Sequence, residues 1–292
     1  MGLFLETVLS GVTVGMLYGL LSFAMVVLYK ATATVNFAQG MMGTAAAFVA
    51  LTVMVEYGVP VGVAIIVGLL FSTFLGVLTF YGVIRPKPSA GKTNVIIRTL
   101  ALSLVLAAYV DRFRGAGQPF QFPQLLSSGG FSLFGIQINY SLIQTFAVAG
   151  VLLGCFSLFF RYTRAGLLTR AMAESRETVR LLGVRSDRLF AVAWGISSFL
   201  AAIVSLLSAN RVYVSTFMLE GYLLYAFTAA IAFGLTSLTG AVIGGICAGL
   251  LSNVVATYFG PDAANLVIFA ALIAVLVIRP QGIFGERRVH RV

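Results

Sequence analysis

The sequence contains several apolar runs of about 20 residues, the length that a helix needs to cross the hydrocarbon core of a bilayer. We place spans near Leu3–Tyr29, Ala38–Val55, Val61–Val83, Val95–Val110, Ser141–Phe160, Leu189–Ala209, Tyr222–Phe233, Ala241–Tyr258 and Asn265–Ile278. The run Tyr222–Phe233 is too short for a full crossing and is typical of a broken or re-entrant helix. We therefore expect an all-α fold, a polytopic transmembrane bundle of eight to ten spans.

Composition supports the same conclusion. Hydrophobic residues make up 60% of the 292 residues, charged residues make up 10%, and the mean hydropathy is +1.01. A soluble domain carries about 25% charged residues, so this chain lacks the polar surface of a soluble protein. Because no Ser/Gly-rich linker interrupts the sequence, we expect one membrane domain over residues 1–292.

The net charge of +10 is distributed asymmetrically. When the basic segment Arg161–Arg188 is placed in the cytoplasm and the spans alternate, only Arg112, Arg114 and Arg211 among the Lys and Arg residues fall outside. This is the positive-inside pattern of a bacterial inner-membrane protein. It predicts an external N-terminus and a cytoplasmic C-terminus, and it explains the basicity without nucleic acid as a partner.

Two insertions between spans carry further information. The first, residues 111–140, is expected outside, where a turn signal at Ser127–Gly130 lies between the strand-like runs Phe120–Pro123 and Phe131–Asn139. This pattern favours either a small hairpin around that turn or an irregular loop.

The second insertion, residues 161–188, is expected in the cytoplasm. Within it, Gly166–Gly183 shows apolar residues at helical spacing with Arg and Glu on the remaining positions, which predicts one or two short amphipathic helices. Such a helix either rests on lipid headgroups or docks a cytoplasmic partner.

Glycines recur at four-residue steps in the first and eighth runs. These are Gly11, Gly15 and Gly19, then Gly240 with Gly244, and Gly245 with Gly249. Small residues at this spacing let helix backbones approach closely inside a membrane, so we expect these positions to be helix-packing surfaces.

The acidic residues limit the possible chemistry. Glu6, Glu56, Asp111, Glu174, Glu177, Asp187, Glu220, Asp262 and Glu286 all fall in loops or at the ends of the expected spans. None is therefore placed as a proton relay within a span. The sequence also has no zinc-protease motif and no nucleotide-binding Gly-rich loop. We expect no catalysis in this chain, so the energy for any transport must come from a partner.

Uncharged polar residues precede two small-residue spans. Asn36 and Gln39 come before the second span, while Thr236 and Ser237 come before the eighth. These four residues either line a translocation path or cap helices and satisfy backbone groups. The similarity of the two stretches is also compatible with an internal repeat, as transporters often have.

Four ordered motifs between Leu9 and Gly285 resemble a known family, the permease subunits of branched-chain amino acid ABC importers. They are Tyr29–Gly40 with Asn-Phe-Ala-Gln-Gly, Gly166–Ala171 followed by Leu-Leu-Gly-Val from Leu181, Phe233–Gly245, and Arg279–Gly285. The chain departs from the family pattern at Val179, where Ala is usual, and at Phe233-Gly234, where the family has a pair of glycines.

The resemblance implies a type II ABC importer permease. It implies a second permease, identical or homologous, two cytoplasmic ATPases that bind ATP and Mg, and a periplasmic or extracellular solute-binding protein. It also implies that the cytoplasmic helix is the coupling helix, with Gly166, Arg170, Ala171, Glu174, Arg176, Glu177 and Gly183 as candidate coupling residues. Alternating access would then carry a small solute along the permeases.

The resemblance leaves the solute open, because the family includes relatives for urea, amides and aromatic acids. A second interpretation of the sequence is a stand-alone channel or an ion-coupled carrier for a small polar solute. Sodium coupling through backbone carbonyls would leave no acidic signature. A copurifying nucleotide-binding subunit distinguishes these interpretations.

Overall fold

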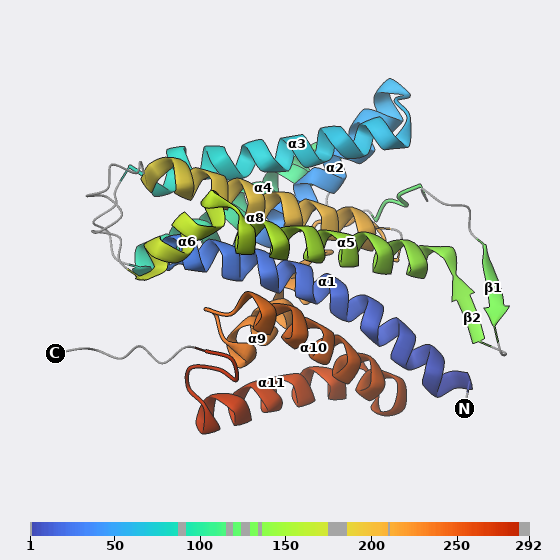
Figure 1. The fold of residues 1–292 in the computed structure, drawn as a ribbon. Coiled ribbons are helices and arrows are strands. Elements are labelled where there is room, and N and C mark those ends of the chain that lie inside the picture. The colour runs from blue at the N-terminus through green and yellow to red at the C-terminus, as the bar shows by residue number, and fades with distance from the viewer. Residues whose placement is uncertain are drawn as a thin grey trace. The chain divides into compact units, whose positions relative to one another are not determined.

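Figure 1 shows the computed structural model, which describes residues 2–86, 92–114, 119–123, 129–133, 136–174, 186–209 and 211–285. The helices are α1 (Gly2–Thr32), α2 (Gln39–Tyr57), α3 (Val61–Thr79), the π-helical turn η1 (Phe80–Ile84), α4 (Lys92–Arg114), α5 (Tyr140–Tyr162), α6 (Arg164–Glu174), α8 (Ser186–Ser208), α9 (Glu220–Phe233), α10 (Leu238–Phe259) and α11 (Pro261–Ile278). The strands are β1 (Gly130–Leu133) and β2 (Ile136–Asn139).

The expected spans correspond to helices of the structure. Among the described residues, eight helices are long and apolar enough to cross a membrane, which confirms a polytopic helical protein. The short seventh run forms α9, a helix of 14 residues. At 1.5 Å per residue it is about 21 Å long, so it is too short for the roughly 30 Å of hydrocarbon.

The chain forms two compact units. The first unit contains the described parts of residues 1–26, 128–157 and 224–292, and the second unit contains those of residues 27–127 and 158–223. The helix α1 contributes its first 26 residues to the first unit and its last turns to the second. The single-domain organisation of the chain stays a prediction.

In the second unit, α2, α3 and α8 pack against one another (Figure 1). Small residues make these contacts close: a Cβ on Gly43 of α2 would lie 2.5 Å from the carbonyl oxygen of Ala201 in α8. A Cβ on Gly76 of α3 would lie 2.6 Å from the carbonyl oxygen of Trp194 in α8. Backbone approach at small residues is the expected way to pack helices where lipid removes the hydrophobic driving force.

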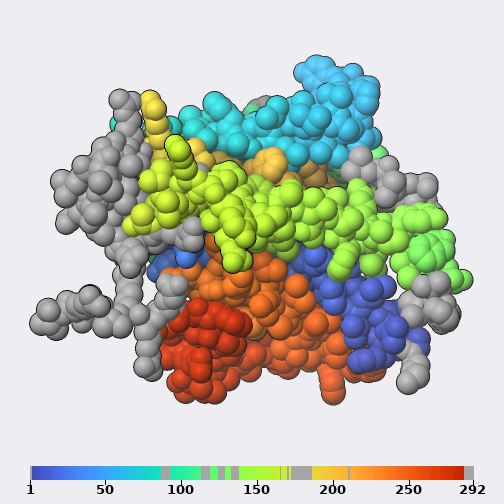
Figure 2. All heavy atoms as spheres, in the orientation of Figure 1, coloured from blue at the N-terminus to red at the C-terminus, as the bar shows by residue number. Residues whose placement is uncertain are grey.

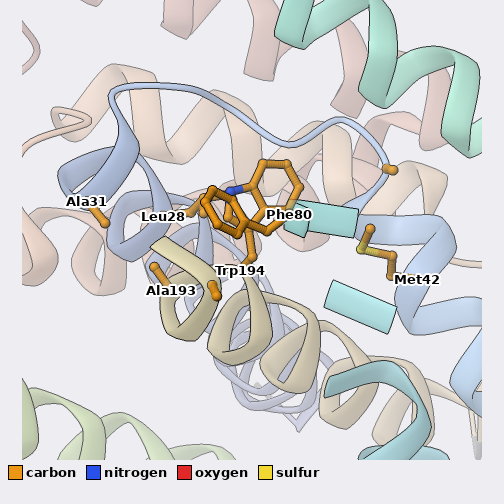
Figure 3. Close-up of a cluster of buried hydrophobic side chains, with 8 residues drawn as sticks. Leu28, Ala31, Met42, Phe80, Ala193 and Trp194 are labelled. Carbon is orange, nitrogen blue, oxygen red and sulfur yellow. The ribbon is translucent and has the colours of Figure 1, made fainter. Parts of the chain in front are cut away.

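Trp194 is the largest fully buried side chain of the structure. Figure 3 shows its indole beside Leu28 and Phe80 in the second unit, and Met42 belongs to the same buried cluster. Phe80 also meets Phe190 edge to face, with ring centroids 6.0 Å apart. Such aromatic pairs add about 0.5–1.5 kcal/mol beyond the area they bury, so this cluster fixes the end of α1 against α8 and η1.

In the first unit, the glycine steps of α1 and α10 face each other. A Cβ on Gly15 would lie 2.8 Å from the Cα of Ile246, and a Cβ on Gly249 would overlap the Cα of Gly15. Asn253 of α10 donates its amide to the carbonyl oxygen of Thr7 at 2.6 Å. These contacts confirm the predicted packing surface. The next helix, α11, lies beside α10 (red beside orange in Figure 2).

The hairpin forms, but not around the predicted turn. Strands β1 and β2 are antiparallel and both lie within the single run Phe131–Asn139 and its preceding glycine, with Phe131 opposite Ile138. Phe120 instead forms an isolated antiparallel bridge with Val214. The predicted pairing of Phe120–Pro123 with Phe131–Asn139 across Ser127–Gly130 is therefore wrong. Pairing within Phe131–Asn139 closes a shorter loop, which costs less entropy. Phe120, from the earlier strand-like run, pairs with Val214 of the same unit instead.

Two segments repeat the same order of elements. Each has a helix, a break at a residue with positive φ, a second helix, a turn at a glycine with positive φ and a nearby proline, and a third helix. The breaks contain Ala33 (φ 53°) and Gly234 (φ 105°), and the turns contain Gly58 (φ 64°) and Gly260 (φ 93°). The order of elements thus matches the internal similarity noted in the sequence.

We expect Gly249→Ala to destabilise the protein by about 1–3 kcal/mol, because the added methyl group overpacks the contact with α1. Gly154→Ala is the matched control in the same unit, since a Cβ there has nothing within 4 Å, and alanine is the better helix former. The apparent melting temperature in detergent should fall for the first variant only. Equal temperatures for both variants would contradict the close approach of α1 and α10.

Candidate functional site

The break before α2 is built around Asn36. Its Oδ1 accepts a hydrogen bond from the Ala38 amide at 2.9 Å, and its Nδ2 lies 3.5 Å from the sulfur of Met42. The side chain is fully buried. The Phe37 amide donates to the hydroxyl of Thr99 at 3.3 Å, so side chains satisfy two amides of this irregular segment, as a segment buried in protein requires.

The break before α10 has a similar construction. The Ser237 hydroxyl accepts a hydrogen bond from the Gly240 amide at 3.0 Å and so acts as an N-cap. Thr236 lies between this cap and Gly234, whose carbonyl accepts from the Ser237 amide at 3.0 Å. Gln39 is the first residue of α2 and is fully buried. These hydrogen bonds support the capping interpretation, and lining of a path by the four residues stays a prediction.

A pocket of about 190 Å³ lies within the second unit. Its lining comes from the start of α2, the middle of α4 and the segment that enters α9: Phe37, Gly40, Met41, Thr44, Leu100, Ser103, Leu104, Thr216, Phe217, Glu220 and Leu223. Most of these side chains are apolar, with a few polar groups among them. That composition is typical of small-molecule sites, and the volume suits a ligand smaller than a drug.

Three polar groups of the lining differ in their surroundings. The Thr216 hydroxyl donates a short hydrogen bond to Asp111, near the end of α4. The Thr44 hydroxyl oxygen is buried and has no hydrogen-bond partner among the described residues. Glu220 is an exposed carboxylate at the first position of α9. The lining therefore contains an exposed carboxylate and a buried hydroxyl without a described partner.

The non-helical segment that leads into α9 is held by hydrogen bonds. Val214 and Phe120 exchange backbone hydrogen bonds at 2.9 and 2.8 Å, and the Met218 amide donates to Ser215 at 3.2 Å. Burial lowers the pKa of the Arg211 guanidinium, and the electrostatic interaction with Tyr222 partly offsets that lowering. Irregular backbone at membrane depth is tolerated where protein satisfies it, so this segment can present Thr216 and Glu220 at a fixed position.

The candidate coupling segment begins with α6. Its entry turn is tight: the Thr163 hydroxyl accepts a hydrogen bond from the Gly166 amide at 3.2 Å, and a Cβ on Gly166 would lie 2.6 Å from the Cα of Phe160. Arg170, Ala171 and Glu174 lie in α6, with Glu174 as its last residue. Arg176, Glu177 and Gly183 lie outside the described residues, so the full extent of the predicted helix is not tested.

Charged groups join helix ends near the start of α8. Arg85 pairs with Asp187 at 2.9 Å, with both side chains about half exposed. Arg98 of α4 donates to the carbonyl oxygens of Val83 and Ile84 at 3.0 and 3.3 Å. An exposed ion pair contributes little, roughly 0–1 kcal/mol, whereas the Arg98 contacts satisfy carbonyls that a helix end leaves open.

Sequence reasoning missed the pocket residues Thr44, Thr216 and Glu220. The sequence does place Glu220 at the start of a run too short to span the membrane, and it places Thr44 one turn into the second span. These two positions are the only signs in the sequence that Glu220 and Thr44 belong to a site. Which residues face a common pocket depends on how α2, α4 and the entry to α9 pack.

Residues 7–276 match the family model described as branched-chain amino acid transport system / permease component. The chain belongs to this family. The permease is 29% identical over 303 residues to the high-affinity branched-chain amino acid transport system permease protein BraD of Pseudomonas aeruginosa, which covers 99% of this chain and 98% of the relative.

Two further relatives carry similar descriptions. LivH of Escherichia coli, a high-affinity branched-chain amino acid transport system permease protein, is 28% identical over 306 residues, covering 99% of the permease and 98% of the relative. A probable branched-chain amino acid transport permease protein LivH of Methanocaldococcus jannaschii is 26% identical over 279 residues, covering 91% and 88%. With its eight span-length helices, the permease is a multi-pass membrane subunit of an ABC transport system.

Asn36→Ala should destabilise the permease by about 1–3 kcal/mol, because the buried Ala38 amide loses its acceptor. Asn36→Ser keeps a short acceptor oxygen and should restore part of the loss. Melting temperature in detergent checks the capping role. If Asn36→Ala leaves stability unchanged and alters only transport, a lining role accounts for this residue instead.

Gly166→Ala should displace the start of α6, because the new Cβ meets the backbone of Phe160 and cannot be relieved by a side-chain rotation. We expect a loss of about 1–3 kcal/mol in stability. Gly62→Ala in α3 is the control in the same unit, since a Cβ there has nothing within 4 Å. A thermal unfolding curve in detergent compares the two variants, and equal midpoints would argue against the tight turn.

Proposed function

We propose that the permease imports branched-chain amino acids, as the names of its relatives say of those proteins. The observation that carries the proposal is the match to a branched-chain permease family over residues 7–276, which includes all eight span-length helices except the ends of the first and last. The small, largely apolar pocket of the second unit is in keeping with such a solute.

The proposed assembly contains a second permease, two cytoplasmic ATPases and an external solute-binding protein. The ATPases bind ATP and Mg, and this chain binds neither. Binding of ATP brings the ATPases together, which opens the paired permeases outward, and hydrolysis resets them. In the proposed orientation the N-terminus lies outside and the C-terminus lies in the cytoplasm, as the positive-inside pattern predicts.

The coupling helix of this proposal begins with α6. The helix follows α5 after one tight turn at Gly166, so a push on α6 acts directly on a membrane-spanning helix. Arg170 and Glu174 stand four residues apart on it and Glu177 follows, which gives the segment charges of both signs for contact with a partner. Arg176 and Gly183 complete the proposed coupling segment.

The test is purification of the tagged permease in mild detergent, with its subunits identified by mass and ATPase activity measured. We expect two ATPase subunits per pair of permeases, and transport of leucine after reconstitution with the solute-binding protein and ATP. Arg170→Ala combined with Glu177→Ala should reduce ATPase recovery by about tenfold or more, because interface charges that pair across a contact contribute about 1.5–7 kcal/mol.

Glu56→Ala is the matched control, since this exposed carboxylate lies near the end of α2, away from the coupling segment in the sequence and on the outside in the proposed orientation. It should leave ATPase recovery unchanged. An ATPase-free oligomer that still moves leucine in liposomes would overturn the importer assignment in favour of a channel or ion-coupled carrier.

A further inference from the structure

We propose that the pocket of the second unit is a transient binding site for the zwitterion of an α-amino acid, with Glu220 receiving the ammonium group and Thr44 with the start of α2 receiving the carboxylate. This inference rests on the proposed function and names the residues that would hold the solute during transfer. It concerns the permease itself rather than the solute-binding protein.

The pocket offers a cation site. Glu220 is the only ionisable residue among the described residues of the lining, and it is exposed at the first position of α9. No Lys or Arg of the lining neutralises it. The carboxylate of Glu220 therefore offers an unneutralised negative charge at the edge of a mostly apolar lining, and the ammonium group of a solute is the complementary charge.

The proposed site for the solute carboxylate comes from α2. Its first turn carries the positive end of the helix dipole, and Gly40 and Met41 of this turn line the pocket. One turn later, the Thr44 hydroxyl is 1% exposed as a residue and has no hydrogen-bond partner among the described residues. A buried hydroxyl without a partner is unfavourable, so a solute carboxylate would satisfy a group that the protein leaves open.

The apolar part of the lining completes the match. Phe37, Leu100, Leu104, Phe217 and Leu223 surround the polar groups with hydrocarbon. The volume of about 190 Å³ is below the roughly 300–1,000 Å³ of pockets for drug-sized ligands. This apolar wall suits a short branched side chain and disfavours a charged one.

The segment that carries Glu220 is positioned rather than free. Thr216, four residues earlier, is tied to Asp111 at the end of α4, and Val214 is tied to Phe120 by two backbone hydrogen bonds. Because α4 also contributes Leu100, Ser103 and Leu104 to the lining, the same helix builds one wall and anchors the segment that bears the carboxylate. That arrangement pre-organises the site and lowers the cost of binding.

The experiment measures leucine binding by equilibrium dialysis, without ATP, to the detergent-purified permease with whatever subunits copurify, washed free of solute-binding protein. Glu220→Gln keeps the size of the side chain and removes its charge; we expect leucine to bind about 10- to 100-fold more weakly, as for loss of a hydrogen bond to a charged group. Thr44→Val should weaken binding about 5- to 10-fold without lowering the melting temperature, because its hydroxyl has no partner to lose. Glu56→Gln is the control and should bind as the wild type does.

Two leucine analogues test the ammonium site and the carboxylate site separately in the wild-type protein. 3-Methylbutylamine lacks the carboxylate and 4-methylpentanoate lacks the ammonium group. The amine should compete with leucine in the wild type and lose most of that competition in Glu220→Gln, while the acid should compete equally in both proteins. This comparison remains informative even if a variant is less stable.

The outcomes distinguish failure of the zwitterion site from failure of the proposed ATP-driven import. If the wild type recovers its ATPases and transports leucine, but leucine does not bind or Glu220→Gln binds it equally well, the zwitterion site is wrong and the importer assignment stands. If leucine binds to the pocket with the expected losses but no ATPase is recovered, the site stands and the ATP-driven assignment fails.

Discussion

Hydrocarbon offers no hydrogen-bond partner, so every backbone amide and carbonyl within the membrane must be satisfied by the protein itself. Helices meet this requirement along their length, and their breaks meet it with side chains. Asn36 accepts from the Ala38 amide before α2, Ser237 caps α10, and Arg98 donates to the carbonyls at the end of η1. Asn36, Ser237 and Arg98 therefore serve the backbone at the places where helices begin and end.

The same constraint allows the protein to place a few polar groups in a largely apolar pocket. A helix that starts within the bundle presents its amide end and the residues of its first turn to the interior, and in the second unit the starts of α2 and α9 both contribute to one pocket. The irregular segment before α9 is tolerated because Phe120 and local turns satisfy its backbone groups, and Asp111 accepts from the Thr216 hydroxyl. Function in such a fold is expected at broken helices rather than at intact spans.

Close packing in both units relies on glycine. Gly15 with Gly249 in the first unit, and Gly43 and Gly76 in the second, let backbones meet where a methyl group would collide. Dispersion between backbones replaces the hydrophobic effect, which lipid removes. The turn at Gly166 uses the same freedom outside the spans and joins α6 to α5. A permease that moves its helices as rigid elements benefits from such contacts, because they are specific and contain few flexible side chains.

The sequence alone determined the spans, the short α9, the glycine surface of α1 and α10, and the family, since these depend on local composition, spacing and motif order. It also predicted the polar residues of both breaks and left capping and lining of a path as alternatives for them; the hydrogen bonds of Asn36 and Ser237 support capping. The register of the hairpin and the bridge between Phe120 and Val214 depended on the tertiary structure, because strand pairing depends on which partner lies in reach. The pocket was likewise decided only there: Thr44 is far in the chain from Thr216 and Glu220, and packing of α2 and α4 with the entry to α9 brings the three residues to one cavity.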